Sequence, residues 1–276
     1  MLGGPCTYAG LAARALGARV ALVSKVGRDF GKKHLAWLRA KGIAVDWVRI
    51  SISSTTRFKI EYQDSGRRME VSSQCDAIAA DDVSVIPSAT AVHLGSVLSE
   101  IPSSLAIQIA KRNPVVSLDA QGYLRGILST GEVREKEWRD DRLLREITVL
   151  KVSEQEAAVM TRADFTIRQL SKLGPEIVLL TKGRRGTDVW STEEGAFRVP
   201  AYETSVRDPT GAGDALVGGF LITWLRKRDL RWSAAIGSAI ASFVVERFGP
   251  SRFGTRKEIE ERAETIMART VRVKGG

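Results

Sequence analysis

The sequence predicts an α/β fold with an open, mostly parallel sheet flanked by helices. Three observations lead to this prediction. Apolar, β-rich runs alternate with helical patterns along most of the chain, glycines follow several of the helices, and only residues 50–75 break the alternation. The 276 residues are 43% hydrophobic and 27% charged, which is enough apolar material for a sizeable core and excludes an extended disordered chain. We therefore expect one domain over residues 1–276.

The first elements follow an order of helix, strand, turn and helix. Residues 9–16 are small and apolar with helical spacing, and Gly17 follows them as a C-cap residue would. We predict a strand over residues 19–26. A turn and then a helix over residues 32–41 come next, and this helix also ends at a glycine.

A β-hairpin is predicted where the alternation breaks. Residues 55–62 and 67–73 have high β propensity, and Gln63-Asp64-Ser65-Gly66 between them has hairpin-turn chemistry. Such a hairpin cannot join a parallel sheet without a crossover. We expect it to be a lid, inserted over residues 50–75, through which two copies could form a homodimer.

After the hairpin the α/β alternation resumes. Ligands gather beyond the carboxyl ends of the strands in such sheets, so Asp119, residues 153–156 and residues 181–186 are expected at the functional edge. The highly charged run over residues 125–141 is expected to be a solvated helix or loop. The predicted strands are 91–94, 115–119, one within 143–152, and 177–181, and the predicted helices are 103–111 and 154–160.

Charge and composition exclude or disfavour several classes of function. The net charge of +10 raises nucleic acid as a partner, but the basic residues are spread along the chain in short clusters such as Arg226-Lys227-Arg228, which argues against that partner. The apolar runs are too short to span a membrane, and the start lacks a secretory signal. Two cysteines, Cys6 and Cys75, favour reduced thiols and a cytoplasmic location. A single asparagine, Asn113, fits a protein from a hot environment.

The segment from Arg207 to Phe220, RDPTGAGDALVGGF, carries the strongest chemical signal. The apolar helix predicted after it places the turn of Gly211, Ala212 and Gly213 at a helix N-terminus, where free N–H groups and the helix dipole can bind an anion. Asp214 follows directly. An anion hole beside a carboxylate can perform phosphoryl transfer, because the acid takes a proton from the attacking hydroxyl while the amides stabilise charge. The simpler alternative is that Asp214 only caps its helix.

The run over residues 208–214 resembles the second signature of the ribokinase-like (PfkB) carbohydrate kinase family, Asp-x-Thr-Gly-Ala-Gly-Asp. Gly3-Gly4-Pro5 through Gly31 resembles the first signature, in which paired glycines approach the acceptor. The resemblance implies a ribokinase-like sheet with a small β lid, ATP as the phosphoryl donor, and Asp214 as the general base. It also implies that Gly3 and Gly4 contact the substrate.

The resemblance extends to the donor side. Thr181-Lys182-Gly183-Arg184-Arg185-Gly186 is similar to the nucleotide loop of the family, which implies nucleotide contacts from Thr181, Lys182, Gly183 and Gly186. A glycine-rich hairpin turn would have the same sequence pattern. Ser153 and Glu156 stand where the family has Asn-x-x-Glu, which implies that Ser153 lies near the nucleotide and that Glu156 holds Mg²⁺ through water. The same two residues also fit a capping box.

Two further sites follow from the resemblance. Asp208 and Thr210 could line a monovalent cation site for K⁺, although Asp208-Pro209 is equally a turn initiator. The segment from Asp119 to Arg125, DAQGYLR, resembles the inositol-kinase-like branch of the family and implies that Asp119, Gln121 and Arg125 bind the acceptor. This favours myo-inositol, then ribose or another sugar, then a nucleoside. A simple turn at Gln121 and a surface ion pair of Arg125 remain the alternative.

The sequence departs from the family in three places. Tyr8 stands where the family often has asparagine, and Ser153 replaces the asparagine of the Mg²⁺ motif. Family members also carry a first strand, an acceptor-binding Asp and part of the lid before the paired glycines, so we expect the N-terminal strand and part of the lid to be missing. The alternative to an active kinase is a catalytically impaired member that acts as a ligand-binding sensor or scaffold.

Overall fold

The computed structural model describes residues 1–63, 66–84, 88–161 and 166–273, and its centre is a seven-stranded sheet. The strand order is β13-β12-β11-β10-β9-β6-β5, with β5, β6, β9 and β10 parallel and the rest antiparallel. The strands are β5 (Val92–Gly95), β6 (Val116–Asp119), β9 (Val149–Ser153), β10 (Ile177–Thr181), β11 (Thr187–Ser191), β12 (Gly195–Val199) and β13 (Val271–Arg272). The strands predicted over residues 91–94, 115–119 and 177–181 are present, and their ends lie within one residue of the prediction. The strand predicted within residues 143–152 is β9.

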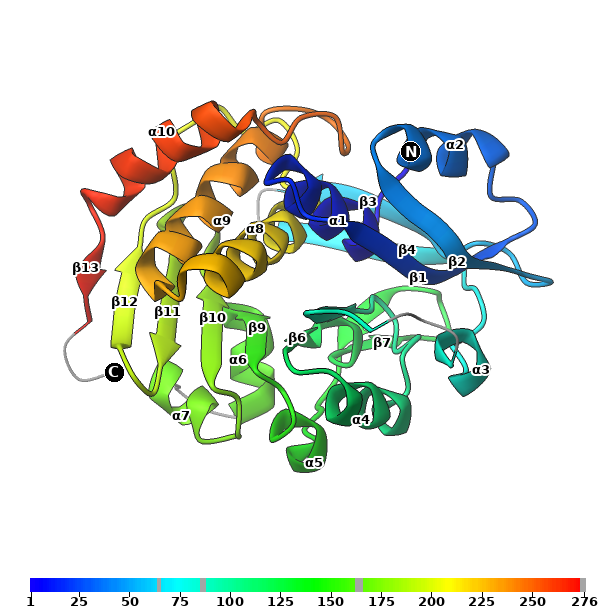
Figure 1. Ribbon diagram of the computed structural model, residues 1–276. Helices are drawn as coiled ribbons and strands as arrows, with labels where there is room; N and C mark the ends of the chain where they lie inside the picture. The colour runs from blue at the N-terminus through cyan, green and yellow to red at the C-terminus, as the bar shows by residue number, and fades with distance from the viewer. Residues whose placement is uncertain (64–65, 85–87, 162–165, 274–276) are drawn as a thin grey trace.

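Helices cover both faces of this sheet, as Figure 1 shows. Four helices lie on one face, namely α1 (Pro5–Ala15), α8 (Ala212–Lys227), α9 (Leu230–Val245) and α10 (Arg256–Met267). The other face carries α4 (Ser103–Arg112), α5 (Asp141–Leu144), α6 (Glu154–Thr161) and α7 (Ile167–Ser171). Two separate apolar cores result, because alternate residues of each strand point to opposite faces. Among the described residues, no helix has the length and apolar character needed to cross a membrane.

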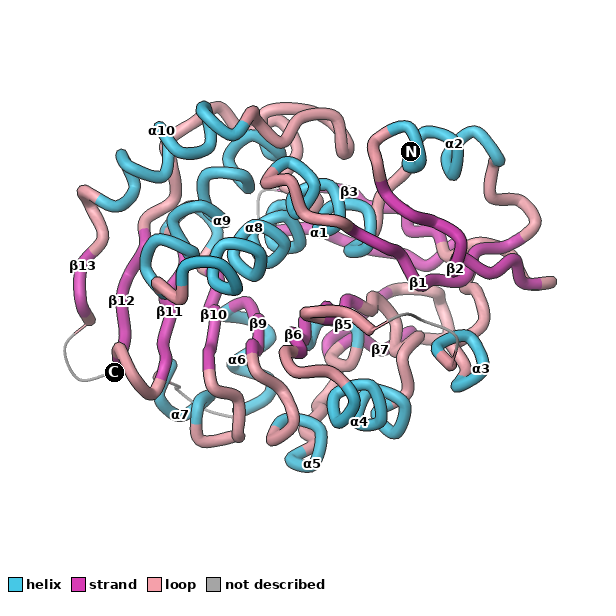
Figure 2. The backbone as a smooth tube through the Cα atoms, viewed as in Figure 1, coloured by secondary structure: helices cyan, strands magenta, loops and turns pink. Residues whose placement is uncertain are grey.

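Over the described residues the chain also forms three two-stranded sheets, and Figure 2 labels β1 and β2 of one of them. β1 (Val20–Gly27) pairs in parallel with β2 (Ile43–Ser51), and α2 (Lys32–Ala40) connects them. β3 (Arg57–Gln63) and β4 (Gly66–Ser73) pair as the predicted hairpin, outside the central sheet, while residues 64 and 65 of its predicted turn lie outside the described residues. The short helix α3 (Ala80–Val83) follows it.

The charged run over residues 125–141 was predicted to be a solvated helix or loop, and this prediction was wrong for residues 125–127 and 133–135. β7 (Arg125–Ile127) and β8 (Val133–Glu135) pair with each other, and Glu132 bridges to Glu70 of the hairpin. The charges do not prevent a strand here because only one short ladder is needed and the side chains stay half-exposed. β2 was also missing from the prediction, although Ile43 and Val45 at its start are buried under α2.

Candidate active site

The turn of Gly211, Ala212 and Gly213 lies at the N-terminus of α8, as predicted. Gly211 is the N-cap residue and has φ 81° and ψ 0°, a left-handed conformation that glycine adopts without steric cost. A side chain there would also collide with the ring of Tyr8 on α1, since an added Cβ would be 2.3 Å from it. The turn therefore packs against a buried aromatic ring. The N–H groups of the turn lie at the positive end of a 16-residue helix.

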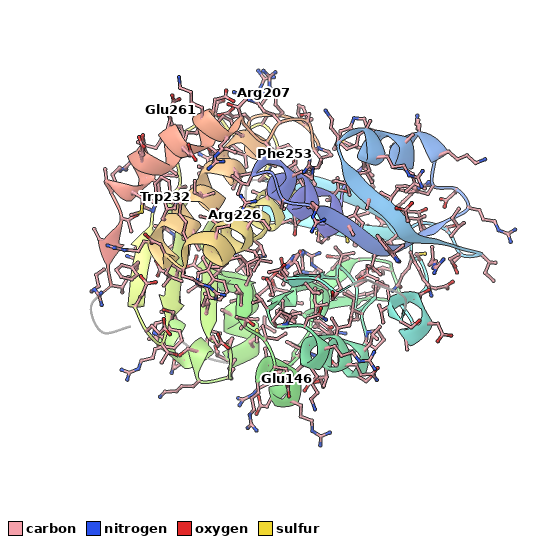
Figure 3. All side chains as sticks on the ribbon, in the orientation of Figure 1. Glu146, Arg207, Arg226, Trp232, Phe253 and Glu261 are labelled. Atoms are coloured by element: carbon pink, nitrogen blue, oxygen red, sulfur yellow. The ribbon has the colours of Figure 1, made fainter. Side chains whose placement is uncertain are left out.

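Phe253 packs against the ring of Tyr8. Figure 3 labels Phe253 beside α1, and its ring centroid is 6.4 Å from that of Tyr8. Arg226, labelled at the other end of α8, donates to the carbonyl of Leu16 at 2.7 Å. Both ends of α8 are thus tied to the two ends of α1. The paired glycines lie at the N-terminus of α1. Gly4 is its N-cap residue, and the Gly3 carbonyl accepts from the Thr7 hydroxyl at 2.9 Å.

Asp214 occupies the first turn of α8, directly after the anion turn. Burial and the nearby carboxylate of Asp119 raise its pKa to about 6. Lys151, Arg125 and a hydrogen bond from Gln121 oppose that rise. A carboxyl group with this pKa is ionised at neutral pH and yet basic enough to accept a proton from a hydroxyl in the transition state.

Asp119 is the last residue of β6 and is fully buried. It faces Lys151 as its register partner on the adjacent parallel strand, and the Lys151 Nζ is 3.0 Å from Asp119 Oδ2. The side-chain amide of Gln121 donates to Asp119 and to Asp214, each at 3.4 Å. Asp119, Gln121 and Asp214 therefore form one connected group. The predicted direct contact of Asp119 with an acceptor stays a prediction.

Glu156 lies at the start of α6, beside the carboxyl end of β9. Its Oε2 accepts from the Ser153 N–H at 2.7 Å, while the Ser153 hydroxyl accepts from the Glu156 N–H at 3.3 Å. This reciprocal pair is a capping box. Burial raises the pKa of Glu156, but the ammonium of Lys151, 3.9 Å away, and the bond from Ser153 outweigh burial, so the pKa is lowered. Glu156 thus presents an ionised carboxylate, the ligand type that Mg²⁺ prefers.

The predicted nucleotide loop follows β10. Thr181 ends the strand, and its hydroxyl donates to the Val152 carbonyl at 3.3 Å. The Lys182 ammonium lies 2.6 Å from Asp188 and 3.9 Å from Glu154. Gly183 begins a short 3-10 helix, and Gly186 ends it. The loop therefore carries a lysine at the edge of the sheet where the ends of β9 and β10 meet.

Asp208 and Thr210 precede the anion turn. Asp208 is 4% exposed, and its Oδ1 accepts from the Thr210 N–H at 2.9 Å, which closes the predicted turn. Tyr62 of the hairpin reaches the same place: its hydroxyl lies 2.6 Å from the Thr210 hydroxyl and 3.2 Å from Asp208. The hairpin thus contacts the segment that leads into the anion turn.

Most of the predicted residues converge on one edge of the sheet, but they form two groups. Asp119, Gln121, Asp214 and Glu156 surround Lys151, while Thr181 and Lys182 belong to the neighbouring loop. Arg125 opens β7, and its charge acts on both Asp214 and Glu156.

The sequence analysis did not single out Lys151 or Tyr62. For Lys151 a signal existed: it is the one charged residue in the otherwise apolar run VLKV, next to a strand that ends in an acid. For Tyr62 there was none, because its partners are 146 and 148 residues away.

Comparison with known proteins identifies the family of this chain. A model of the pfkB family of carbohydrate kinases matches residues 3–256. The chain belongs to the pfkB family. It is a kinase of the ribokinase-like fold.

Three similar proteins are informative. A cytidine kinase of Thermococcus kodakarensis is 28% identical over 266 residues, which cover 90% of this chain and 89% of the relative. A pyrophosphate-dependent kinase in the ribokinase family, solved with a pyrophosphate analogue and myo-inositol, has a TM-score of 0.80 at 23% identity and covers 94% and 90%. The ribokinase of Arabidopsis thaliana, solved with ribose and ATP, has a TM-score of 0.74 at 22% identity and covers 95% and 87%.

Proposed function

We propose that this kinase transfers the γ-phosphoryl group of ATP to a hydroxyl of a small polyhydroxylated acceptor. The observation that supports this best is the position of Asp214 in the first turn of α8, directly after the Gly211–Gly213 turn, with a pKa raised to about 6. This position places the proton acceptor, Asp214, and the N–H groups that stabilise negative charge within a few consecutive residues.

The reaction we propose has one chemical step. The acceptor hydroxyl loses its proton to Asp214 as its oxygen bonds to the γ-phosphorus, and the bond from that phosphorus to the bridging oxygen of ADP breaks. The N–H groups of Gly211, Ala212 and Gly213 stabilise the charge on the transferring group. Asp214 is only partly exposed, which limits the access of water to the base while the acceptor is bound.

On the donor side, we propose that Thr181, Lys182, Gly183 and Gly186 hold the nucleotide, with Ser153 near its phosphates. Mg²⁺ would neutralise the donor phosphates, with Glu156 as its carboxylate, through water. The oxygen chemistry and the lowered pKa of Glu156 support this assignment. Asp208 and Thr210 are proposed to line a K⁺ site. Their shared turn gives two oxygens next to the anion hole.

For the acceptor we propose myo-inositol first, contacted by Gly3, Gly4, Gln121 and Arg125, with ribose or another sugar next. The solved inositol complex of a similar fold supports testing it. A nucleoside is the second candidate, because the relative with 28% identity is named a cytidine kinase. We also propose that the hairpin acts as a lid and as a dimer contact. Ile50 and Ile52 next to it are 64% and 84% exposed, which supports an apolar contact there.

The test is a screen of acceptors for donor consumption. Purified protein is mixed with ATP or pyrophosphate, Mg²⁺ and one acceptor from a set of inositols, pentoses, hexoses and nucleosides, and ADP or phosphate release is measured. We expect ADP release with one polyhydroxylated acceptor. Tight ligand binding by calorimetry without any product release would instead support a sensor. Phosphate release with pyrophosphate as donor, without ADP release when ATP is the donor, would overturn ATP as the donor.

Asp214→Asn is the matched control, because it keeps the shape of the side chain and removes the base. We expect kcat to fall by about two to four powers of ten, the usual contribution of general-base catalysis, while calorimetry shows ATP binding unchanged. Wild-type turnover in this variant would show that Asp214 is not the base.

A further inference from the structure

Lys151 is an unusual residue for its place in the fold. It lies in the middle of the central sheet, on β9, between the apolar residues Leu150 and Val152, and its side chain is 8% exposed. An unpaired ammonium at such a depth is costly, so a buried lysine normally has partners that offset the loss of water. Lys151 lies on the α8 side of the sheet, because the residue two before it, Val149, belongs to the core under that helix.

The partners of Lys151 are all parts of the proposed site. Its Nζ lies 3.0 Å from Asp119 and 3.9 Å from Glu156. It also lies behind the anion turn, since a Cβ added to Gly213 would be 3.3 Å from Nζ. One interior cation is thus shared between the proposed acceptor side, the proposed Mg²⁺ carboxylate and the anion hole.

A chain of contacts leads from Lys151 to the proposed base. Lys151 holds Asp119 at Oδ2, and Asp119 in turn accepts from the backbone N–H of Gln121 at 3.1 Å through Oδ1. The side chain of Gln121 then donates to Asp214. Since Asp119 is fully buried, it cannot rotate to another partner without breaking this chain.

We propose that the buried pair of Lys151 and Asp119 positions Gln121 and, through it, the carboxylate of Asp214, and that the Lys151 ammonium adds positive charge behind the anion hole. Lys151 is a positioning residue: it does not touch the reacting atoms. This inference rests on the proposed function, because it assigns Lys151 a part in the work of Asp214.

Electrostatics predict opposite effects for the two members of the pair. The Asp119 carboxylate raises the pKa of Asp214, and the Lys151 ammonium lowers it. A pair that only stabilised the core would give two variants with the same defect. The other groups that act on Asp214, or on which it acts, come from α1, η1 (Ala120–Gly122) and β7, and are Cys6, Tyr8, Gln121 and Arg125.

The experiment is a titration of the Asp214 carboxyl by carbon-13 NMR in the protein without ligands, with Asp214→Asn used to assign its signal. In Lys151→Met we expect the pKa of Asp214 to rise by about one unit, and in Asp119→Asn to fall by about one unit. The double variant, Asp119→Asn with Lys151→Met, should lie between them. Movement in the same direction in both single variants, or no movement in either, would overturn the proposal.

Two further readouts separate positioning from folding. Lys151→Met leaves the buried carboxylate of Asp119 without its counter-ion, so we expect Tm to fall by roughly 10 °C. The double variant should recover most of this loss. With an acceptor found in the screen, kcat of the double variant should still be about 10-fold to 100-fold below wild type at unchanged donor KM. Wild-type kcat in the double variant would contradict the positioning role.

The two proposals fail separately. If the wild-type protein phosphorylates no acceptor, the proposed function fails, yet the NMR titration still reports how Lys151 and Asp119 act on Asp214. If the wild type is active and the titration shows no opposed shifts, only the role of Lys151 is wrong.

Discussion

Two groups of charges lie on or directly after neighbouring strands, and their outer members differ in burial. Within β9, Lys151 is buried and paired with a fully buried Asp119. Directly after β10, Lys182 and its partner Asp188 are also mostly buried, but Asp188 pairs in turn with Arg198, which is half exposed. The residue types are the same, but the consequences are not.

Burial decides what each group can do. A buried pair is held in one arrangement and shifts the pKa of its neighbours, since solvent does not screen it. The Arg198 end of the second group reaches solvent, so water screens it and its pairing is worth less to stability. We therefore expect the Lys151 group to hold the base, and we propose that the Lys182 loop receives the charged donor.

The largest expected effect that tests this comparison is Gly211→Ala, set against Gly183→Ala in the donor loop. Both glycines have positive φ, 81° and 55°, but only Gly211 has a ring against it. We expect Gly211→Ala to cost roughly 2 to 5 kcal/mol, from the left-handed backbone and the clash with Tyr8 together. Gly183→Ala should cost about 1 to 2 kcal/mol, from the backbone alone.

Urea unfolding of the two variants measures the difference. A Gly211→Ala variant as stable as Gly183→Ala would mean that Tyr8 moves away without cost. The proposed difference between a rigid anion turn and a less constrained donor loop would then be wrong.

The second prediction concerns pH. Asp214 must be ionised to accept a proton, and its pKa is about 6, so kcat should fall about tenfold per unit as pH drops below 6 and level off above it. The donor side should not contribute to this limb, because burial tends to raise the pKa of Asp188 but Arg198 and Lys182 bring it below its usual value.

Stability should change in the opposite direction to activity. Folding raises the pKa of Asp214 from 3.8 to about 6. Its contribution to stability is fully present below pH 3.8 and is lost as the pH rises through about 6. Its size is on the order of 3 kcal/mol. Asp214→Asn should therefore raise Tm at pH 8 and not at pH 4, as measured by calorimetry. An equal change at both values would contradict the raised pKa.

The smallest effects are expected in the donor loop. Lys182→Met removes a cation from a site proposed to bind phosphates, so KM for the donor should rise about tenfold while kcat changes less. Arg185→Ala is the control: its side chain is 72% exposed and pairs only at the surface with Glu154, so both constants should stay within about twofold. Equal effects of the two variants, measured by steady-state kinetics, would remove the special role of Lys182.

The sequence alone was enough to predict much of this molecule. The alternation of strands and helices predicted the parallel half of the sheet, because its strands are short apolar runs that stand out between helical patterns. The Gly-Ala-Gly-Asp run predicted the anion turn and Asp214, since glycine and a helix start have local causes. β2, the β7–β8 pair and the antiparallel strands β11, β12 and β13 were not predicted. β7 and β8 have three residues each, too few to show a period, and in β2 the charged Asp46 and Arg49 interrupt the apolar pattern.

Only the tertiary structure decided which charges are buried and which meet. That Lys151 faces Asp119 depends on the register of β6 against β9, and that Tyr62 reaches Asp208 depends on where the hairpin lies. Neither follows from local sequence, because the partners are distant along the chain. The residue types set which chemistry is possible, whereas burial and register set the pKa of Asp214 and therefore whether it can act as a base.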